Sequence, residues 1–82
     1  MLIGVSYDLN RIGQKYKALD AALRRATAQR VIETFWIVKA NSVADVHKYV
    51  EQYFDDNDEW MVFEMTQPIG RLDKEDWQFL AA

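Results

Sequence analysis

The feature that most constrains the fold of this chain is the apolar run at residues 2–7, which ends on a carboxylate, Asp8. Apolar, β-branched and aromatic residues bounded by turn formers predict a buried strand. An unpaired carboxylate inside such a strand would cost free energy, because it would lose its hydration. Asp8 is therefore expected at the carboxyl end of the strand, beside a turn formed by residues 10–13.

Two roles for Asp8 follow from that position. Ligands and metals often bind at the ends of strands in open sheets, which makes Asp8 a candidate ligand. Aspartate also often accepts hydrogen bonds from the backbone of an adjacent turn, which would make Asp8 purely structural. The sequence leaves both roles open.

The length of 82 residues predicts a single domain, residues 1–82. So small a domain buries a limited share of its surface, and association into a homodimer would add stability. The chain contains no cysteine, which excludes disulfides and thiolate metal sites. It has neither a signal-peptide pattern nor an apolar run long enough to span a membrane, so we expect a cytoplasmic protein with no membrane partner.

Charge is distributed unevenly along the chain. Residues 1–39 carry seven basic and three acidic side chains, whereas residues 40–82 carry three basic and ten acidic ones. A chain of this kind can present a basic face to nucleic acid although its net charge is −3. The alternative is that these are ordinary solvated charges that form no patch.

Residues 13–28 show helical spacing, with an apolar stripe that comprises Tyr16, Leu19, Ala22, Leu23 and Ala26. Lys17, Arg24 and Arg25 lie away from this stripe, and Asp20 stands four residues before Arg24. The pattern predicts an amphipathic helix whose basic face either binds a partner or is simply hydrated.

Residues 30–40 are nearly all β formers and exceed the usual length of a strand. Two short strands that meet near Glu33 and Thr34, in a tight hairpin or a bulge, are expected, with one long bent strand as the rival. The absence of Gly, Asn and Asp at that point argues against a tight hairpin.

Ser42, followed by Asp45, resembles a capping box and predicts that a helix begins there. The apolar face of that helix would comprise Val43, Val46, Val50, Tyr53 and Phe54. His47, the only histidine, has no Cys or second His near it and is read as structural.

Residues 55–58 read as an acidic turn, since they lack the glycine and the late glutamate of a calcium loop. Residues 59–66 predict a strand with Met61, Phe63 and Met65 on one face and Trp60 and Val62 on the other. Asp73 then caps a short terminal helix whose Trp77 and Leu80 can fold back onto the sheet.

The expected order is strand, helix, strand, strand, helix, strand. This order predicts an α+β, ferredoxin-like βαββαβ fold, with an antiparallel sheet, two helices on one face and a short C-terminal helix. The second face of the sheet would be left for a partner. Trp60 and Val62 are the candidates for that uncovered surface and hence for a homodimer interface.

The order of several short motifs resembles the small CRISPR-associated "Cas-two" superfamily, and within it the stand-alone SinR-like branch. The motifs are a first strand that ends in Tyr7-Asp8-Leu9, a basic first helix, the strand of residues 34–39, and the turn of residues 56–59 before the last strand. The resemblance implies a ferredoxin-like homodimer in which Asp8 of both subunits binds a divalent metal, Mg²⁺ or Mn²⁺. The serine and phenylalanine of the family's third strand correspond to Thr34 and Trp36 here.

Two functions of different classes follow. The first is a metal-dependent endonuclease or endoribonuclease with Asp8 as the catalytic and metal-binding residue. The second, which the acidic second half and the departures from the family pattern favour, is a non-catalytic dimeric scaffold that binds RNA or DNA. In both, the nucleic-acid backbone would be held by basic side chains, namely Arg11, Lys15, Lys17, Arg24 and Arg25.

Overall fold

The computed structural model describes residues 1–8, 14–68 and 70–82, and for residues 14–16 it describes the backbone only. Its elements, in chain order, are β1 (Leu2–Asp8), α1 (Gln14–Arg25), β2 (Ala28–Ile32), β3 (Phe35–Lys39), α2 (Val43–Val50), the single 3₁₀ turn η1 (Glu51–Tyr53), β4 (Glu59–Met65) and α3 (Lys74–Ala81).

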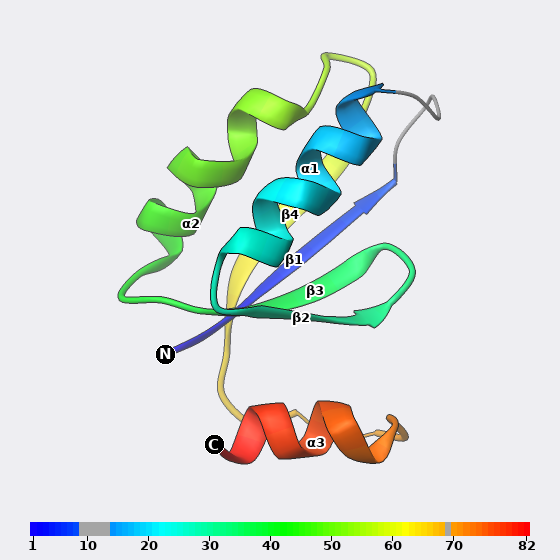
Figure 1. The fold of residues 1–82 in the computed structure, drawn as a ribbon. Helices are drawn as coiled ribbons and strands as arrows, with labels where there is room; N and C mark the ends of the chain where they lie inside the picture. The colour runs from blue at the N-terminus through cyan, green and yellow to red at the C-terminus, as the bar shows by residue number, and fades with distance from the viewer. Residues whose placement is uncertain (9–13, 69) are drawn as a thin grey trace.

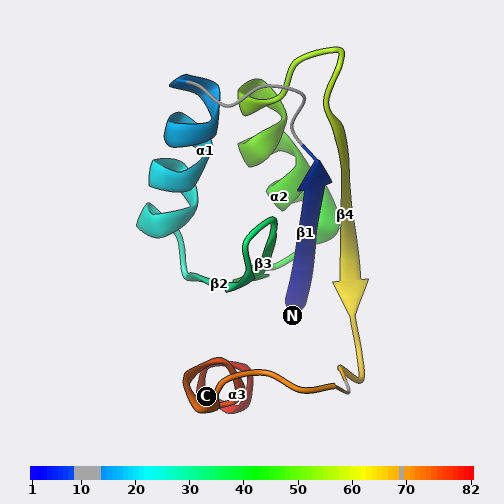
Figure 2. The ribbon, with the colours of Figure 1, turned by 90° about the vertical axis from the view of Figure 1, so that its right-hand side faces the viewer.

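The four strands form one antiparallel sheet in the order β2-β3-β1-β4. β1 therefore lies inside the sheet and pairs with β3 on one side and with β4 on the other, whereas β2 and β4 are the two edges. Helices α1 and α2 cover the same face of the sheet (Figures 1 and 2). This is the predicted ferredoxin-like α+β arrangement, with α3 added at the C-terminus.

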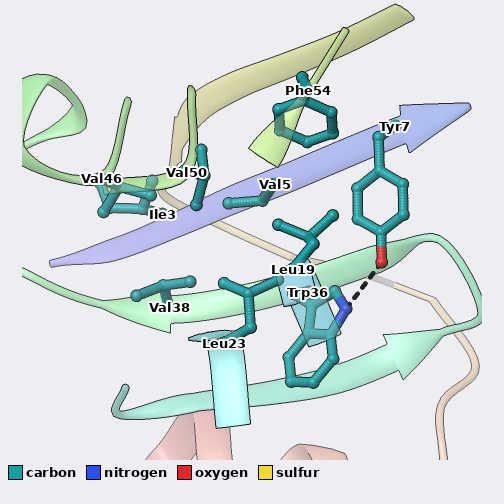
Figure 3. Packing of buried hydrophobic residues seen from close by; sticks show 10 residues of the cluster. All are labelled: Ile3, Val5, Tyr7, Leu19, Leu23, Trp36, Val38, Val46, Val50 and Phe54. Atoms are coloured by element: carbon teal, nitrogen blue, oxygen red, sulfur yellow. Dashed lines mark hydrogen bonds between the residues drawn. The ribbon is translucent and has the colours of Figure 1, made fainter. Parts of the chain in front are cut away.

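The core lies between the sheet and the first two helices (Figure 3). Every second residue of β1 points into it, as the pleat of a strand requires, and these residues are Ile3, Val5 and Tyr7. The predicted stripe of α1 packs against them, with Leu19, Ala22 and Leu23 fully buried. α2 adds Val46 and Val50, and β3 adds Trp36 and Val38.

An aromatic row crosses this core from β3 to β4. The indole Nε1–H of Trp36 donates to the hydroxyl of Tyr7 at 3.0 Å. The Tyr7 ring contacts Phe54 with a centroid separation of 5.7 Å, and Phe54 stacks on Trp60 at 4.5 Å. Because its one polar group is satisfied, Trp36 can be buried without the cost of an unpaired donor.

Two short strands, and not one long bent strand, follow α1. β2 and β3 form a hairpin in which Ile32 pairs with Phe35, and the ladder has an irregularity between Arg30 and Ile32. None of the described non-glycine residues has a positive φ, so the turn is not of the type that needs Asn or Gly. The hairpin and the bulge that the sequence offered as alternatives occur together.

The predicted helix of residues 13–28 extends too far at its C-terminal end. α1 ends at Arg25, and Ala28 is already paired with Val38 of β3. Alanine favours helix locally, but the ladder hydrogen bonds and the packing of β2 outweigh that preference.

α2 begins where the sequence predicts. The Ser42 side chain accepts a hydrogen bond from the backbone N–H of Asp45 at 3.1 Å. The acidic segment after η1 is a turn, as expected: the Asp58 carboxylate accepts from the Asp55 N–H at 2.7 Å, and the Asp58 N–H donates to the Asp55 carbonyl at 3.0 Å. The Asp58 carboxylate therefore has a structural role in the turn.

The second face of the sheet carries a smaller apolar cluster. The rings of Phe35 and Phe63 meet edge to face with centroids 5.9 Å apart. They meet over the chain at Gly4, where an added Cβ would lie 2.5 Å from the Phe63 ring. α3 lies beyond this face of the β2–β3 hairpin (Figure 1), and its Trp77 lines an apolar cavity with Phe35 and Ile37. The expected return of Trp77 to the sheet is confirmed.

Polar contacts also hold α3 in place. Asp76 is 5% exposed, and its carboxylate accepts a hydrogen bond from the Gln29 side chain at 2.9 Å. The Lys39 ammonium donates to the Ala82 carbonyl at 2.9 Å and lies over the Phe79 ring. α3 therefore docks on the hairpin and covers only that half of the second face.

The placement of Trp60 and Val62 on the uncovered face is wrong. Both side chains pack against the buried cluster under the helices, and Trp60 stacks on Phe54. β4 carries apolar residues on both of its faces. The alternation of its side chains therefore does not indicate which face packs against the helices. The apolar side chains that β4 contributes to the second face are instead Met61, Phe63 and Met65, and Met61 is 59% exposed.

Candidate functional site

Asp8 lies at the carboxyl end of β1 and is exposed, where the sequence predicts it. Its partner across the β1–β4 ladder is Glu59, the first residue of β4. Directly opposed residues of antiparallel strands point to the same face with Cβ atoms about 4.5–5.5 Å apart, and like charges in such a pair repel. The register thus places two exposed carboxylates on one face of the sheet, an arrangement that would favour binding of a cation. The turn of residues 10–13 lies outside the described residues, so the structural role of Asp8 stays a hypothesis.

Asp8 and Glu59 line an open hollow of about 410 Å³ together with Ser6 and Met61. In the part of the chain that the structure describes, no three or more His, Cys, Asp or Glu side chains come together as a metal-binding group. Mg²⁺ keeps several waters and is commonly held by only one or two carboxylates, so Asp8 and Glu59 can serve as a minimal donor set in one chain. A second copy of the pair would add two more carboxylates.

Basic side chains gather where α1 lies beside β2, the opposite edge of the sheet. Arg24 donates from Nε to Oδ2 of Asp20 at 2.7 Å, and Arg30 of β2 donates from Nη2 to Oδ1 of the same carboxylate. Both guanidinium groups also lie over the Trp36 ring, with Cζ at 5.7 Å and 5.2 Å from its centroid. The Asp20 carboxylate thus holds two arginines over one aromatic ring. We call these four residues, Asp20, Arg24, Arg30 and Trp36, the arginine cluster.

The remaining predicted nucleic-acid residues are not all together. Lys17 is exposed and stands on the same side of α1 as Asp20 and Arg24, at helical spacings of three and seven residues. Arg25 is exposed but lines a different hollow, near Lys39 and Tyr49. Arg11 lies outside the described residues, and for Lys15 only the helical backbone is described.

The charge asymmetry of the sequence becomes an asymmetry between the two edges of the sheet. α1 and β2 together carry five basic residues and one acidic residue, and they pack against each other. Residues 55–65, which include β4, carry five carboxylates and no basic residue. Of these charged segments, β2 and β4 are the opposite edges of the sheet, whereas α3, with Glu75 and Asp76, brings acidic residues to the β2–β3 hairpin. The hypothesis of a basic face stays a prediction.

Two site residues could not be found from the sequence. Glu59 is 51 positions from Asp8, and only the strand register brings them opposite each other. The sequence predicts Arg30 only as the first residue of an extended segment, and nothing local distinguishes it except its charge beside apolar residues.

His47 stacks on Trp60 at 5.0 Å and lies 3.6 Å from Glu51, contacts that suit the structural role expected for it.

No protein-family model matches the chain, and comparison with curated proteins finds no match. The resemblance to the "Cas-two" superfamily therefore rests on the short motifs and their order. None of the described helices is both long and apolar enough to cross a membrane.

Proposed function

We propose that this protein is a cytoplasmic, homodimeric, non-catalytic scaffold that binds RNA or DNA through the α1–β2 edge. The observation that carries the proposal is Arg24 of α1 beside Arg30 of β2, at the edge remote from the acidic β4. Lys17 and Arg25 are further exposed cations of α1. A basic edge of this kind attracts the phosphate backbone of a nucleic acid. The acidic edge repels the same backbone and so disfavours binding elsewhere on the surface. The resemblance to the "Cas-two" superfamily supports an association with nucleic acid, and the departures from the family pattern at Thr34 and Trp36 favour the non-catalytic role.

The proposal is tested by the salt dependence of binding. A labelled oligonucleotide should bind the wild type, with an affinity that falls steeply between about 50 and 200 mM salt. Arg24→Glu with Arg25→Glu should remove binding, because it reverses the charge of two side chains expected to contact the phosphate backbone of the nucleic acid. Fluorescence anisotropy measures both.

Lys48→Glu with Lys74→Glu is the matched control. It makes the same change in net charge at exposed positions that belong to other elements, α2 and α3. Equal loss of binding in both double variants would show only bulk electrostatics, and the proposed edge would then be wrong. A wild type that binds no nucleic acid at low salt would refute the function itself.

Association of two chains is expected through the half of the second face that α3 leaves uncovered. Met61 is 59% exposed there, beside the half-buried Phe63. Exposed apolar side chains on an uncovered sheet face favour an isologous contact between two copies. Sedimentation at tens of micromolar should show a dimer, which Met61→Asp should weaken; a monomeric wild type would contradict this part of the proposal.

The Asp8–Glu59 pair favours a second candidate function, a Mg²⁺- or Mn²⁺-dependent nuclease. Two copies of the pair across a dimer axis would supply four carboxylates, a donor type that both ions accept. A bound divalent ion would orient water and stabilise charge on the scissile phosphate. Purified wild type should then cleave RNA or DNA only with the metal, and Asp8→Ala and Glu59→Gln should not cleave.

Thermal melting provides a readout that does not depend on activity. Without metal, Asp8→Asn should be neutral or stabilising, because it removes one of two opposed charges. Mn²⁺ should raise the melting temperature of the wild type but not of this variant. Glu64→Gln, on the same strand and exposed, is the control and should respond to Mn²⁺ as the wild type does. A wild type indifferent to Mn²⁺ would rule out the nuclease.

A further inference from the structure

The arginine cluster borders a polar hollow of about 400 Å³ at the outer edge of the sheet, lined by Arg24, Arg30 and Trp36 with Ala28 and Gln29. β2 is an edge strand, so nothing of the described sheet lies beyond it. The hollow therefore faces outward from the α1–β2 edge, with two guanidinium groups in its wall.

The cluster is preorganised by three kinds of contact: ion pairs, cation–π contacts and a hydrogen bond. Asp20 holds both guanidinium groups through its two oxygens. The Trp36 ring supports both groups from one side, and the hydrogen bond from its Nε1–H to Tyr7 fixes the ring itself. Side chains held in this way lose little conformational entropy when they bind a further group.

Asp20 does not satisfy the two arginines. Each guanidinium has five N–H donors, and the contacts with Asp20 use one from each. The Nε of Arg30 is the one buried side-chain nitrogen or oxygen without a hydrogen-bond partner among the described residues. The cluster also carries one net positive charge. Because this Nε is shielded from solvent, the donors that remain for an anion are the other terminal N–H groups of the two guanidinium groups, together with the net charge.

We propose that the arginine cluster is a binding site for a phosphate group. Arginine pairs with phosphate through parallel N–H···O bonds, and its planar group stays charged at all ordinary pH values. Trp36 is 1% exposed and its ring is covered by the arginines, so it offers no surface on which a base could stack. The site therefore recognises phosphate and not the base, and binding there is independent of sequence.

The source of that phosphate is a nucleic-acid strand, an assignment that rests on the proposed function. Lys17 stands two helical turns before Arg24 on the same side of α1 and extends the line of positive charge. A second phosphate of the same strand would thus also meet a cation. Free phosphate shares the chemistry of the site, and the experiment separates the two sources.

The test follows the indole N–H signal of Trp36 by NMR while inorganic phosphate is added at constant ionic strength. The signal should shift saturably in the wild type, because phosphate binds the two guanidinium groups that lie over the ring and so changes the environment of the indole. Arg30→Gln and Arg24→Gln should each weaken the apparent affinity by roughly tenfold or more, the effect of losing charge-assisted hydrogen bonds. Arg24 has a side chain that is 61% exposed, so its variant keeps the test valid if Arg30→Gln unfolds the protein.

Arg25→Gln is the matched control, since it removes the same charge one residue along α1, from a side chain outside the cluster. It should leave the phosphate-induced shift intact. The absence of a saturable shift in the wild type would overturn the proposal. An equal loss in the Arg24 and Arg25 variants would also overturn it, because it would show general attraction and no site.

A labelled oligonucleotide separates this inference from the proposed function. Binding that inorganic phosphate displaces, and that weakens in Arg30→Gln but not in Lys48→Gln on α2, supports both. A phosphate-induced shift without any oligonucleotide binding keeps the phosphate site but refutes the nucleic-acid source and the proposed function. Oligonucleotide binding that is indifferent to Arg30 and Arg24 refutes the site and leaves the proposed function standing.

Discussion

The two faces of the sheet are built differently. The side chains of β1 and β3 that face α1 and α2 are at most 5% exposed, and they belong to one cluster with apolar residues of both helices. On the other face, α3 covers the β2–β3 hairpin, and the rest carries half-buried or exposed residues such as Met61. One face stabilises the fold, whereas part of the other remains available for a partner. Substitutions on each face should therefore differ in their effects on stability.

The largest loss is expected in the helix-covered core. Leu23→Ala should lower the free energy of unfolding by about 2–5 kcal/mol, because Leu23 is fully buried and its removal leaves a cavity. Chemical denaturation monitored by circular dichroism measures this. A loss below about 1 kcal/mol would mean that the core collapses easily, and the contrast between the faces would be weaker than described.

Gly4→Ala probes the second face from within the sheet. The new methyl group would lie 2.5 Å from the Phe63 ring, so the ring must move, at a cost of about 1–3 kcal/mol. Phe63→Ala should be destabilising by itself, but in that background Gly4→Ala should cost far less. A double-mutant cycle measures this coupling, and additive effects would show that the Phe63 ring does not press on Gly4.

Trp77→Ala should loosen the packing of α3 on the hairpin. The expected loss is roughly 1–2 kcal/mol, less than for a fully buried tryptophan, because Trp77 is half-buried and lies in a terminal helix. Hydrogen exchange should become faster in α3 and at Ile37 while α1 keeps its protection. Faster exchange throughout the chain would show that α3 is part of the core and not a separate cover.

Met61→Ser should have the smallest effect on the isolated chain, within about 0.5 kcal/mol, since the side chain is 59% exposed. If the uncovered half of this face joins two copies, the dimer should nevertheless weaken, and stability should then depend on protein concentration in the wild type. Melting temperatures that are independent of concentration in both proteins would assign this surface to solvent.

Local signals in the sequence predicted most elements correctly. The stripe Leu19–Ala22–Leu23, the cap at Ser42 and the alternation of β1 involve residues close in the chain, whose contacts follow from helical or strand periodicity. The position of Asp8 at the end of β1 also follows, because a carboxylate is expelled from a buried strand. Even the hairpin near Glu33 was anticipated, since eleven β formers exceed one strand.

Contacts between residues distant in the chain could not be predicted. β4 is apolar on both faces, and only the packing of Trp60 on Phe54 decides that Trp60 and Val62 face the helices. The opposition of Asp8 and Glu59 depends on the β1–β4 register, which no local pattern specifies.

By itself, then, the sequence determined the type and order of the elements, the amphipathic faces of the helices and the separation of charge between its two halves. The tertiary structure alone decided which strands are edges, which face of β4 is buried and that Arg30 joins Arg24 on Trp36 through Asp20. The physical reason is that periodicity, capping and charge act over a few residues. Strand register and helix docking, in contrast, are set by the packing of the whole core.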